Sequence, residues 1–203
     1  MKSKSKVAGI ILAAGEAKRM GRSKLRLPYG SGTILDAVIG AARRSPLAPI
    51  IVVLGHKAAA IRATVDLEGL AVVDNPRYRQ GQSTSLQTGL TRVPDTCQGA
   101  MFLLGDQPRI TPSLIGKLVD SFDSRRDRLV IPRHQGRRGN PVIAHRELFP
   151  RISKLTGDTG ARPLFREFSD HIRWVESADG SLFFDVDTPG DYKTLLTSPA
   201  QAD

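Results

Sequence analysis

The sequence predicts an α/β domain with a mainly parallel central sheet flanked by helices. Short apolar runs without alternation are typical of strands buried on both faces, and helix-length stretches separate these runs along the chain. Gly, Asp or Asn-Pro follows several of the runs. Because right-handed crossovers place the loops after parallel strands along one edge of the sheet, we expect the ligand site at that edge.

The regular part of the pattern covers the first two thirds of the chain. Buried strands are expected over Val7–Ala13, Ile50–Leu54, Leu70–Val73, Ala100–Leu104 and Arg128–Ile131. Helices are expected between them, over Leu35–Arg44, Lys57–Val65, Ser83–Thr91 and Thr111–Phe122. Thr111 is expected as an N-cap with Pro112 at the first helical position, and Ser83 as the N-cap of the helix that it begins.

The last third is less regular. Pro141–Ala144 suggests an edge strand and Ile172–Val175 a further strand, with helices over Arg146–Leu155, Ala161–Phe168 and Gly190–Leu196. We expect one domain over residues 7–197. Residues 1–6 are expected to form a disordered basic tail and residues 198–203 a second disordered tail.

Composition excludes several classes of protein. The 203 residues are 40% hydrophobic and 25% charged, which suits a globular domain rather than a disordered or fibrous chain. The longest apolar run is far shorter than the ~20 residues of a membrane span, and no signal-peptide pattern is present, so we expect a cytoplasmic protein without a membrane partner. A single cysteine, Cys97, forbids an internal disulfide and suits a reducing compartment. The four histidines lack metal-ligand spacing, and no nucleic-acid-binding signature occurs, so no nucleic acid partner is expected.

The charge is strongly positive and unevenly spread. The formal net charge is +10, and the excess is concentrated in residues 2–26 and 125–138. Such clustering favours an anionic partner, such as a nucleotide, a phosphorylated metabolite or a nucleic acid. A solvated basic surface explains the composition equally well, so charge alone leaves both interpretations open.

A glycine-containing basic loop follows the first predicted strand. Ala13, Ala14 and Gly15 are small enough for the backbone to approach a ligand and donate N–H groups to phosphate oxygens. Arg19 and Lys24 can add charge-assisted contacts. The loop has neither the Gly-Lys-Ser/Thr ending of a Walker loop nor the Gly-x-Gly-x-x-Gly of a dinucleotide fold, so it predicts a phosphate loop of another kind.

This loop, Leu-Ala-Ala-Gly-(x)3-Arg-Met-Gly-(x)2-Lys, resembles the signature of nucleotidyltransferases that transfer NMP from an NTP to a phosphate or sugar-phosphate. Five further segments, in order, resemble the molybdenum cofactor cytidylyltransferases and their MobA-like relatives: Gly81–Leu86, Leu104–Pro108, Gly139–Val142, Gly157–Arg162 and Phe184–Pro189. The resemblance extends from Val7 to Tyr192. It implies a Rossmann-like nucleotidyltransferase fold.

The resemblance also implies a reaction, the transfer of CMP from CTP to the terminal phosphate of molybdopterin, giving molybdopterin cytosine dinucleotide and pyrophosphate. The guanylyltransferases of the family resemble Leu-Ala-Gly-Gly and carry an acid before the signature lysine, whereas this chain has Ala14 and Ser23, which favours cytosine. GTP or another phosphorylated acceptor remains an alternative, as does a non-catalytic binding protein. A recipient molybdoenzyme or its chaperone is a further expected partner.

A Mg²⁺ site is expected from two loops that are far apart in the sequence. Asp106 follows the fourth strand, and Mg²⁺ is normally held by one or two carboxylates together with substrate phosphates. A turn-forming role is the alternative for Asp106. Asp185 and Asp187 alternate along an extended stretch and so point to opposite sides. The family pattern favours Asp187 as the second ligand, with Asp185 turned inward to brace the loop.

The resemblance assigns roles to a defined set of residues. The catalytic set is Arg19, Lys24, Asp106 and Asp187, of which the two aspartates hold the metal. The nucleotide-binding set is Leu12, Ala13, Ala14, Gly15, Arg19, Lys24, Gln82, Ser83, Thr84 and Asp106. The acceptor-binding set is Asn140, Asp158 and Arg162.

Overall fold

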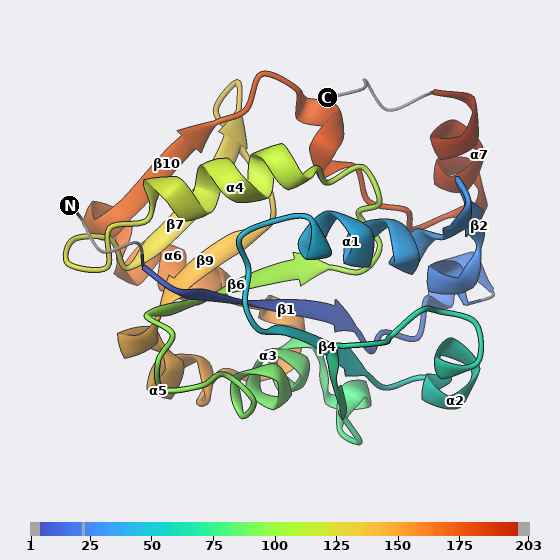
Figure 1. The fold of residues 1–203 in the computed structure, drawn as a ribbon, viewed down its shortest axis with the longest axis horizontal. Helices are drawn as coiled ribbons and strands as arrows, with labels where there is room; N and C mark the ends of the chain where they lie inside the picture. The colour runs from blue at the N-terminus through green and yellow to red at the C-terminus, as the bar shows by residue number, and fades with distance from the viewer. Residues whose placement is uncertain (1–4, 22, 199–203) are drawn as a thin grey trace.

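The computed structural model describes residues 5–21 and 23–198 and shows a central sheet between two layers of helices (Figure 1). The eight-stranded sheet has the order β10-β7-β9-β6-β1-β4-β5, and β8 pairs with β7. The strands are β1 Val7–Ala13, β4 Ile50–Leu54, β5 Ala71–Asp74, β6 Gly99–Leu104, β7 Leu129–His134, β8 Arg137–Arg138, β9 Val142–His145 and β10 Ile172–Glu176. The predicted α/β fold is confirmed.

Strand β1 lies in the middle of the sheet and runs parallel to both of its neighbours, β4 and β6. Its side chains alternate between the two faces, so Ile10 and Ile11 belong to different hydrophobic clusters. Both residues are fully buried. The apolar run is continuous because helices cover both faces.

The helices divide between these faces, and Figure 1 shows α1 and α4 on one side of β1 and β6 and α3 and α5 on the other. Helices α1 Ile34–Arg43, α2 Ala58–Arg62 and α4 Pro112–Ser121 pack with one cluster of core residues. Helices α3 Gln82–Leu90, α5 Phe149–Ile152 and α6 Arg162–Glu167 pack with the other. Helix α7 Pro189–Thr197 and the small hairpin of β2 Pro28–Tyr29 and β3 Gly32–Thr33 lie beside the phosphate loop, where Met20, Leu27, Val186 and Leu195 form a third cluster.

The prediction of an edge strand over Pro141–Ala144 was wrong. Strand β9 lies between β6 and β7, is antiparallel to both, and is buried along its whole length. Pro141 precedes the strand, so its missing N–H interrupts no ladder and both sides of the strand can pair. The sheet is therefore parallel only outside this strand and β8.

Two helix predictions also need correction. The helix expected over Arg146–Leu155 is a 3₁₀ turn, Arg146–Leu148, followed by the single turn α5, because Pro150 is tolerated only in the first turn of a helix. Ser83 is not an N-cap: α3 begins at Gln82 with Gly81 as its cap. The N-cap at Thr111 is confirmed, since its side chain accepts a hydrogen bond from the Leu114 N–H.

The predicted tails lie mostly outside the described residues, at 1–4 and 199–203. The described ends are hydrogen-bonded: the Lys6 N–H donates to Gln98 Oε1 over 2.7 Å, and Arg109 Nη2 donates to the Ser198 carbonyl over 2.7 Å. Within the described part of the chain, no helix has the length and apolar character required to cross a membrane.

Candidate active site

A cavity of about 380 Å³ opens at the carboxyl ends of β1 and β6, where the sequence placed the ligand site. The phosphate loop forms one wall and the start of α3 another. The loop before α7 brings in Asp187, and the segment before α6 brings in Asp158. The lining residues are Leu12, Ala13, Ala14, Gly15, Glu16, Ala17, Arg19, Lys24, Leu25, Tyr78, Arg79, Gly81, Gln82, Ser85, Leu104, Asp106, Asp158 and Asp187.

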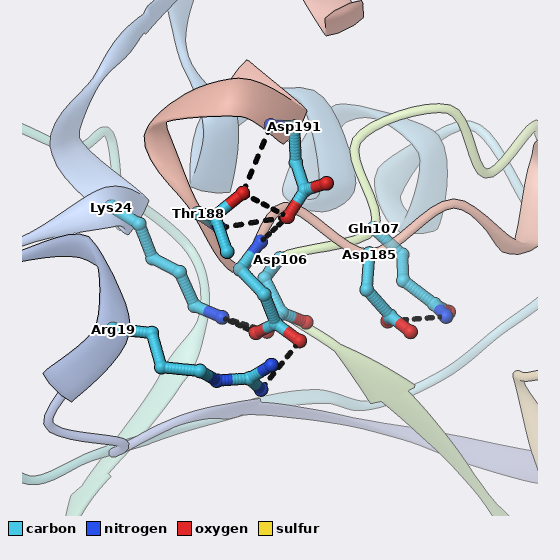
Figure 2. Close-up of polar contacts among 8 residues, drawn as sticks. Arg19, Lys24, Asp106, Gln107, Asp185, Thr188 and Asp191 are labelled. Carbon is cyan, nitrogen blue, oxygen red and sulfur yellow. Dashed lines mark hydrogen bonds and ion pairs between the residues drawn. The ribbon is translucent and has the colours of Figure 1, made fainter.

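Lys24 and two aspartates form the charged cluster of this first cavity (Figure 2). Lys24 Nζ lies 2.5 Å from Asp106 Oδ2 and 2.7 Å from Asp187 Oδ1. Arg19 Nη2 donates to the second oxygen of Asp187 over 2.7 Å. The fold therefore brings together all four residues of the predicted catalytic set.

Hydrogen bonds fix the loop that carries Asp187. The Val186 N–H donates to the Asp106 carbonyl over 3.1 Å, which joins the two aspartate loops directly. Thr188 is the N-cap of α7 and forms a capping box with Asp191. Asp191 Oδ2 also accepts from the Asp187 N–H over 3.1 Å (Figure 2). The position of the Asp187 carboxylate thus depends on the start of α7 and on the end of β6.

Mutual attraction favours the charged forms of Lys24 and Asp187. Burial opposes the charged form of Lys24, but the carboxylates of Asp106 and Asp187 raise its pKa above the ordinary value. Burial alone would raise the pKa of Asp187, yet Lys24 and Arg19 hold it below the ordinary value. Both groups are therefore ionised at neutral pH and present opposite charges to a ligand.

The donor set suits a divalent cation that shares its ligands with a substrate. Asp106 and Asp187 offer hard carboxylate oxygens, which Mg²⁺ prefers, and one ammonium group bridges both of them. Among residues 5–21 and 23–198, no group of three or more His, Cys, Asp or Glu side chains could hold a metal by itself. Two carboxylates completed by phosphate oxygens are the arrangement that these residues fit.

A second cavity, of about 280 Å³, adjoins the first and shares Leu12, Gln82 and Leu104 with it. Its walls are more aromatic and include two arginines. The lining residues are Leu12, Gln82, Leu86, Phe102, Leu104, Gln107, Arg138, Gly139, Asn140, Val142, Thr159, Gly160, Ala161, Arg162, Phe165, Phe183 and Asp185. Two ligands that met at the shared residues would occupy one cavity each.

Asp185 belongs to this second cavity. Figure 2 shows it beside Gln107 and apart from Lys24. Gln107 Nε2 donates to Asp185 Oδ1 over 2.8 Å and to the Phe183 carbonyl over 3.3 Å. The Asp185 side chain is exposed to the cavity, but the surrounding protein desolvates it and, with the nearby charge of Asp106, raises its pKa to about 6.

Most of the predicted nucleotide-binding residues line the first cavity, but two do not. Ser83 is fully buried, and its hydroxyl has no hydrogen-bond partner among the described residues. Thr84 Oγ1 accepts from Asn75 Nδ2 and donates to backbone carbonyls within the protein. Neither side chain faces either cavity. Ser85 does line the first cavity, and its spacing of three from Gln82 on a helix was the available signal.

The predicted acceptor residues separate between the two cavities. Asn140 and Arg162 line the second cavity. Asp158 lines the first, where its Oδ1 accepts from the Gln82 N–H over 2.9 Å and serves the helix start that Gly81 cannot cap with a side chain. Gly81 itself has φ of 109°, and an added Cβ would lie 2.3 Å from the Gly157 backbone. This close approach requires glycine.

The sequence did not indicate several residues that line the two cavities and lie outside the phosphate loop. In the first cavity these include Tyr78 and Arg79, whose guanidinium lies 5.6 Å from the Tyr78 ring and whose Nε lies 3.2 Å from Glu16 Oε1. In the second they include Arg138, whose guanidinium lies 5.2 Å from the Phe165 ring. The contacts of Arg79 with Glu16 and of Arg138 with Phe165 join segments far apart in the chain, so no local pattern indicates them.

A sheet that carries a basic phosphate loop and two facing carboxylates at the C-terminal ends of its strands is characteristic of nucleotidyltransferases. The profile of the family described as the MobA-like NTP transferase domain matches residues 9–175. The chain belongs to this family.

Named relatives share most of the chain. It is 29% identical to the molybdenum cofactor cytidylyltransferase of Escherichia coli, over 91% of this chain and 93% of that protein. It is 31% identical to nicotine blue oxidoreductase of Paenarthrobacter nicotinovorans, over 94% and 96%. It is 28% identical to a molybdenum cofactor guanylyltransferase of Mesorhizobium japonicum, over 91% and 92%. The relatives therefore include enzymes named for different nucleotides.

Solved structures agree with the fold. The crystal structure of Rv0371c from Mycobacterium tuberculosis in complex with manganese has a TM-score of 0.81 and 32% identity, covering 97% of this chain and all of that one. Manganese, like Mg²⁺, is a divalent cation with a preference for oxygen ligands. That relative thus provides a precedent for a divalent metal on this fold.

Proposed function

We propose that the protein transfers CMP from CTP to the terminal phosphate of molybdopterin, forming molybdopterin cytosine dinucleotide and pyrophosphate. The observation that carries this proposal is the cluster of Lys24, Asp106 and Asp187 in a cavity that adjoins a second cavity. The first cavity would hold the nucleotide and the second the acceptor. Their shared wall would be the place where the acceptor phosphate meets the α-phosphorus.

The chemistry requires little from the protein beyond alignment and charge neutralisation. A phosphate monoester is already an anion at neutral pH, so the attacking oxygen needs no general base. Lys24 and Arg19 would hold the triphosphate and stabilise the pyrophosphate as it leaves. Asp106 and Asp187 would hold Mg²⁺, which when bound neutralises phosphate charge.

The choice of CTP rests on the family comparison of the phosphate loop. The guanylyltransferase pattern has glycine where this chain has Ala14 and an acid where it has Ser23. Ala14 is buried, and a Cβ added to Gly55 would lie 2.8 Å from its methyl group, so this methyl packs toward Gly55. Relatives named for the two nucleotides are about equally identical to this chain, at 29% for a cytidylyltransferase and 28% for a guanylyltransferase, so the loop residues carry the choice.

A non-catalytic binding protein is the less favoured alternative. Such a protein would not need a lysine and two carboxylates brought together from three loops, as Lys24, Asp106 and Asp187 are here. We further infer a cytoplasmic location, since a single cysteine suits a reducing compartment.

The test is a pyrophosphate-release assay with purified protein, Mg²⁺ and each of the four NTPs in turn. The acceptor is molybdopterin or its molybdenum form. We expect the highest kcat/KM with CTP. Equal or better turnover with GTP would overturn the cytidylyl assignment but not nucleotidyl transfer. The absence of pyrophosphate with all four NTPs would contradict the proposed reaction.

A further inference from the structure

The stretch Asp185-Val186-Asp187 directs its two carboxylates into different cavities. Val186 is fully buried, and its N–H is bonded to the Asp106 carbonyl, so the backbone between the two aspartates is fixed. Asp187 lines the first cavity, where two cations contact it. Asp185 lines the second, where no cation among the described residues forms an ion pair with it.

Gln107 binds one of the two oxygens of the Asp185 carboxylate. The glutamine is almost fully buried, and its Nε2 donates to both Asp185 Oδ1 and the Phe183 carbonyl. One carboxylate oxygen of Asp185, Oδ1, therefore already accepts a hydrogen bond from an amide group of the protein. The other, Oδ2, accepts no hydrogen bond from the described residues, and the residue lines the second cavity.

Aromatic and aliphatic side chains form part of the wall of this cavity. Phe102, Phe165 and Phe183 line the second cavity together with Leu86 and Val142. A ligand that fills the cavity must displace the water that solvates Asp185. Because a carboxylate oxygen that loses its water also loses hydrogen bonds, a ligand that brings a donor to this oxygen is favoured over one that does not.

We propose that Asp185 is a specificity-determining residue of the acceptor site, where its Oδ2 accepts a hydrogen bond from an N–H group on a flat heterocycle of the phosphorylated acceptor. The proposal rests on the proposed function for its assignment of the second cavity to the acceptor. The aromatic walls fit a flat ring. Arg138 and Arg162, which line the same cavity, fit the anionic part of such a molecule.

The competing role for Asp185 is that of a metal ligand in place of Asp187. The geometry disfavours it, because one oxygen of Asp185 is held by Gln107 and its side chain lies on the opposite side of the strand-like stretch from Asp187. The two roles predict different kinetic changes, which makes them separable.

The first experiment measures binding without any transfer reaction. Pterin and 1,3-dimethyllumazine share a bicyclic ring, but 1,3-dimethyllumazine has a carbonyl where pterin has an amino group and methyl groups on the ring nitrogens beside it, so only pterin presents N–H donors there. Fluorescence titration of the wild-type protein should show pterin binding about tenfold more tightly than 1,3-dimethyllumazine. No binding of pterin, or equal affinity for both, would overturn the proposal without any variant being needed.

Asp185→Asn sharpens this measurement. Gln107 would hold the new amide oxygen, which turns the amide N–H₂ toward the ligand and opposes a donor with a donor. We expect about a tenfold loss of pterin affinity and no remaining preference over 1,3-dimethyllumazine. Asp170→Asn, an exposed aspartate outside both cavities, is the matched control and should bind as the wild type does. Unchanged pterin affinity in Asp185→Asn would also overturn the proposal.

Steady-state kinetics then separate the acceptor role from the metal role. Asp185→Asn should raise the acceptor KM about tenfold while the CTP KM and the half-saturating Mg²⁺ concentration stay unchanged. A shifted Mg²⁺ requirement with an unchanged acceptor KM would identify a metal ligand and overturn the proposal. If the wild type transfers no nucleotide to molybdopterin, the proposed function fails, and the pterin titration still decides the role of Asp185.

Discussion

The two cavities differ in how their charges are balanced before any ligand binds. In the first, Lys24 contacts two carboxylates, Arg19 contacts Asp187, and Arg79 contacts Glu16. In the second, Arg138 lies against a phenylalanine ring and Asp185 accepts from a neutral amide. Among the described residues, no ion pair joins the charged side chains of the second cavity.

This difference indicates two modes of recognition. A ligand of the first cavity must exchange existing ion pairs for its own charges, so affinity and rate should depend on charged residues and on metal. A ligand of the second cavity meets aromatic side chains and polar groups that no ion pair joins among the described residues, so shape and hydrogen bonding should decide which molecule binds. Substitutions should therefore change nucleotide and metal parameters on one side and acceptor parameters on the other.

The largest effect is expected from the two carboxylates of the first cavity. Asp106→Asn and Asp187→Asn should each reduce kcat by at least ~10²-fold and weaken the Mg²⁺ dependence, because each removes a charged metal ligand. The double variant should be hardly worse than the poorer single one, since the two act as a unit. Mg²⁺ titrations of the rate in the four proteins provide the measurement. Retained activity in both single variants would exclude the metal site, and an inactive Asp185→Asn beside an active Asp187→Asn would identify Asp185 as the metal ligand in place of Asp187.

Lys24→Ala tests the cation that bridges these carboxylates. Loss of a charge-assisted contact to the triphosphate in a water-poor site should lower kcat by ~10²–10³-fold. Thermal unfolding should change little, and Lys193→Ala, an exposed lysine on α7, serves as the control. Near wild-type activity would remove Lys24 from the mechanism.

Arg162→Ala should show the opposite kinetic pattern. The side chain lines the second cavity, so its removal should raise the acceptor KM about tenfold and leave the CTP KM unchanged. Arg166 lies on the same helix but outside both cavities, which makes Arg166→Ala the matched control. If Arg162→Ala instead raised the CTP KM, the assignment of the two cavities would have to be reversed.

Ala14→Gly tests nucleotide choice within the first cavity. Removal of the methyl group restores the glycine of the guanylyltransferase pattern and should raise the ratio of GTP to CTP turnover by up to about tenfold. The measurement is kcat/KM for each nucleotide at a saturating acceptor concentration. An unchanged ratio would mean that other residues select the base.

The smallest effect concerns the turn that carries the aromatic wall of the second cavity. Asp179 accepts from Ser181 N and Ser181 Oγ, each over 2.7 Å, and these hydrogen bonds lower its pKa. A lowered carboxyl pKa contributes stability above the unfolded-state value, and this contribution is lost as pH falls through the folded-state value. Asp179→Asn should therefore cost less than about 1 kcal/mol at pH 7 and nothing at a pH well below both values. Urea unfolding at several pH values would measure it, and a difference that did not vary with pH would contradict this explanation.

The sequence by itself determined the elements whose signals are local. Val7–Ala13 and Ile50–Leu54 are continuous apolar runs, and both are buried strands at the predicted positions. The phosphate loop between Leu12 and Lys24 was recognisable because small residues and basic residues at fixed spacing reflect a backbone requirement. The opposite directions of Asp185 and Asp187 followed from the alternation of an extended chain.

The tertiary structure alone decided how these local pieces meet. It placed β9 inside the sheet, because pairing on both sides depends on partners from β6 and β7. It turned Ser83 into the core and Ser85 into the cavity, because Gly81 and Asp158 fix where α3 begins. It also set Lys24 between Asp106 and Asp187. Local patterns record burial and backbone preference, whereas contacts between distant segments depend on the packing of the whole sheet, so the charge balance of each cavity could be known only from the fold.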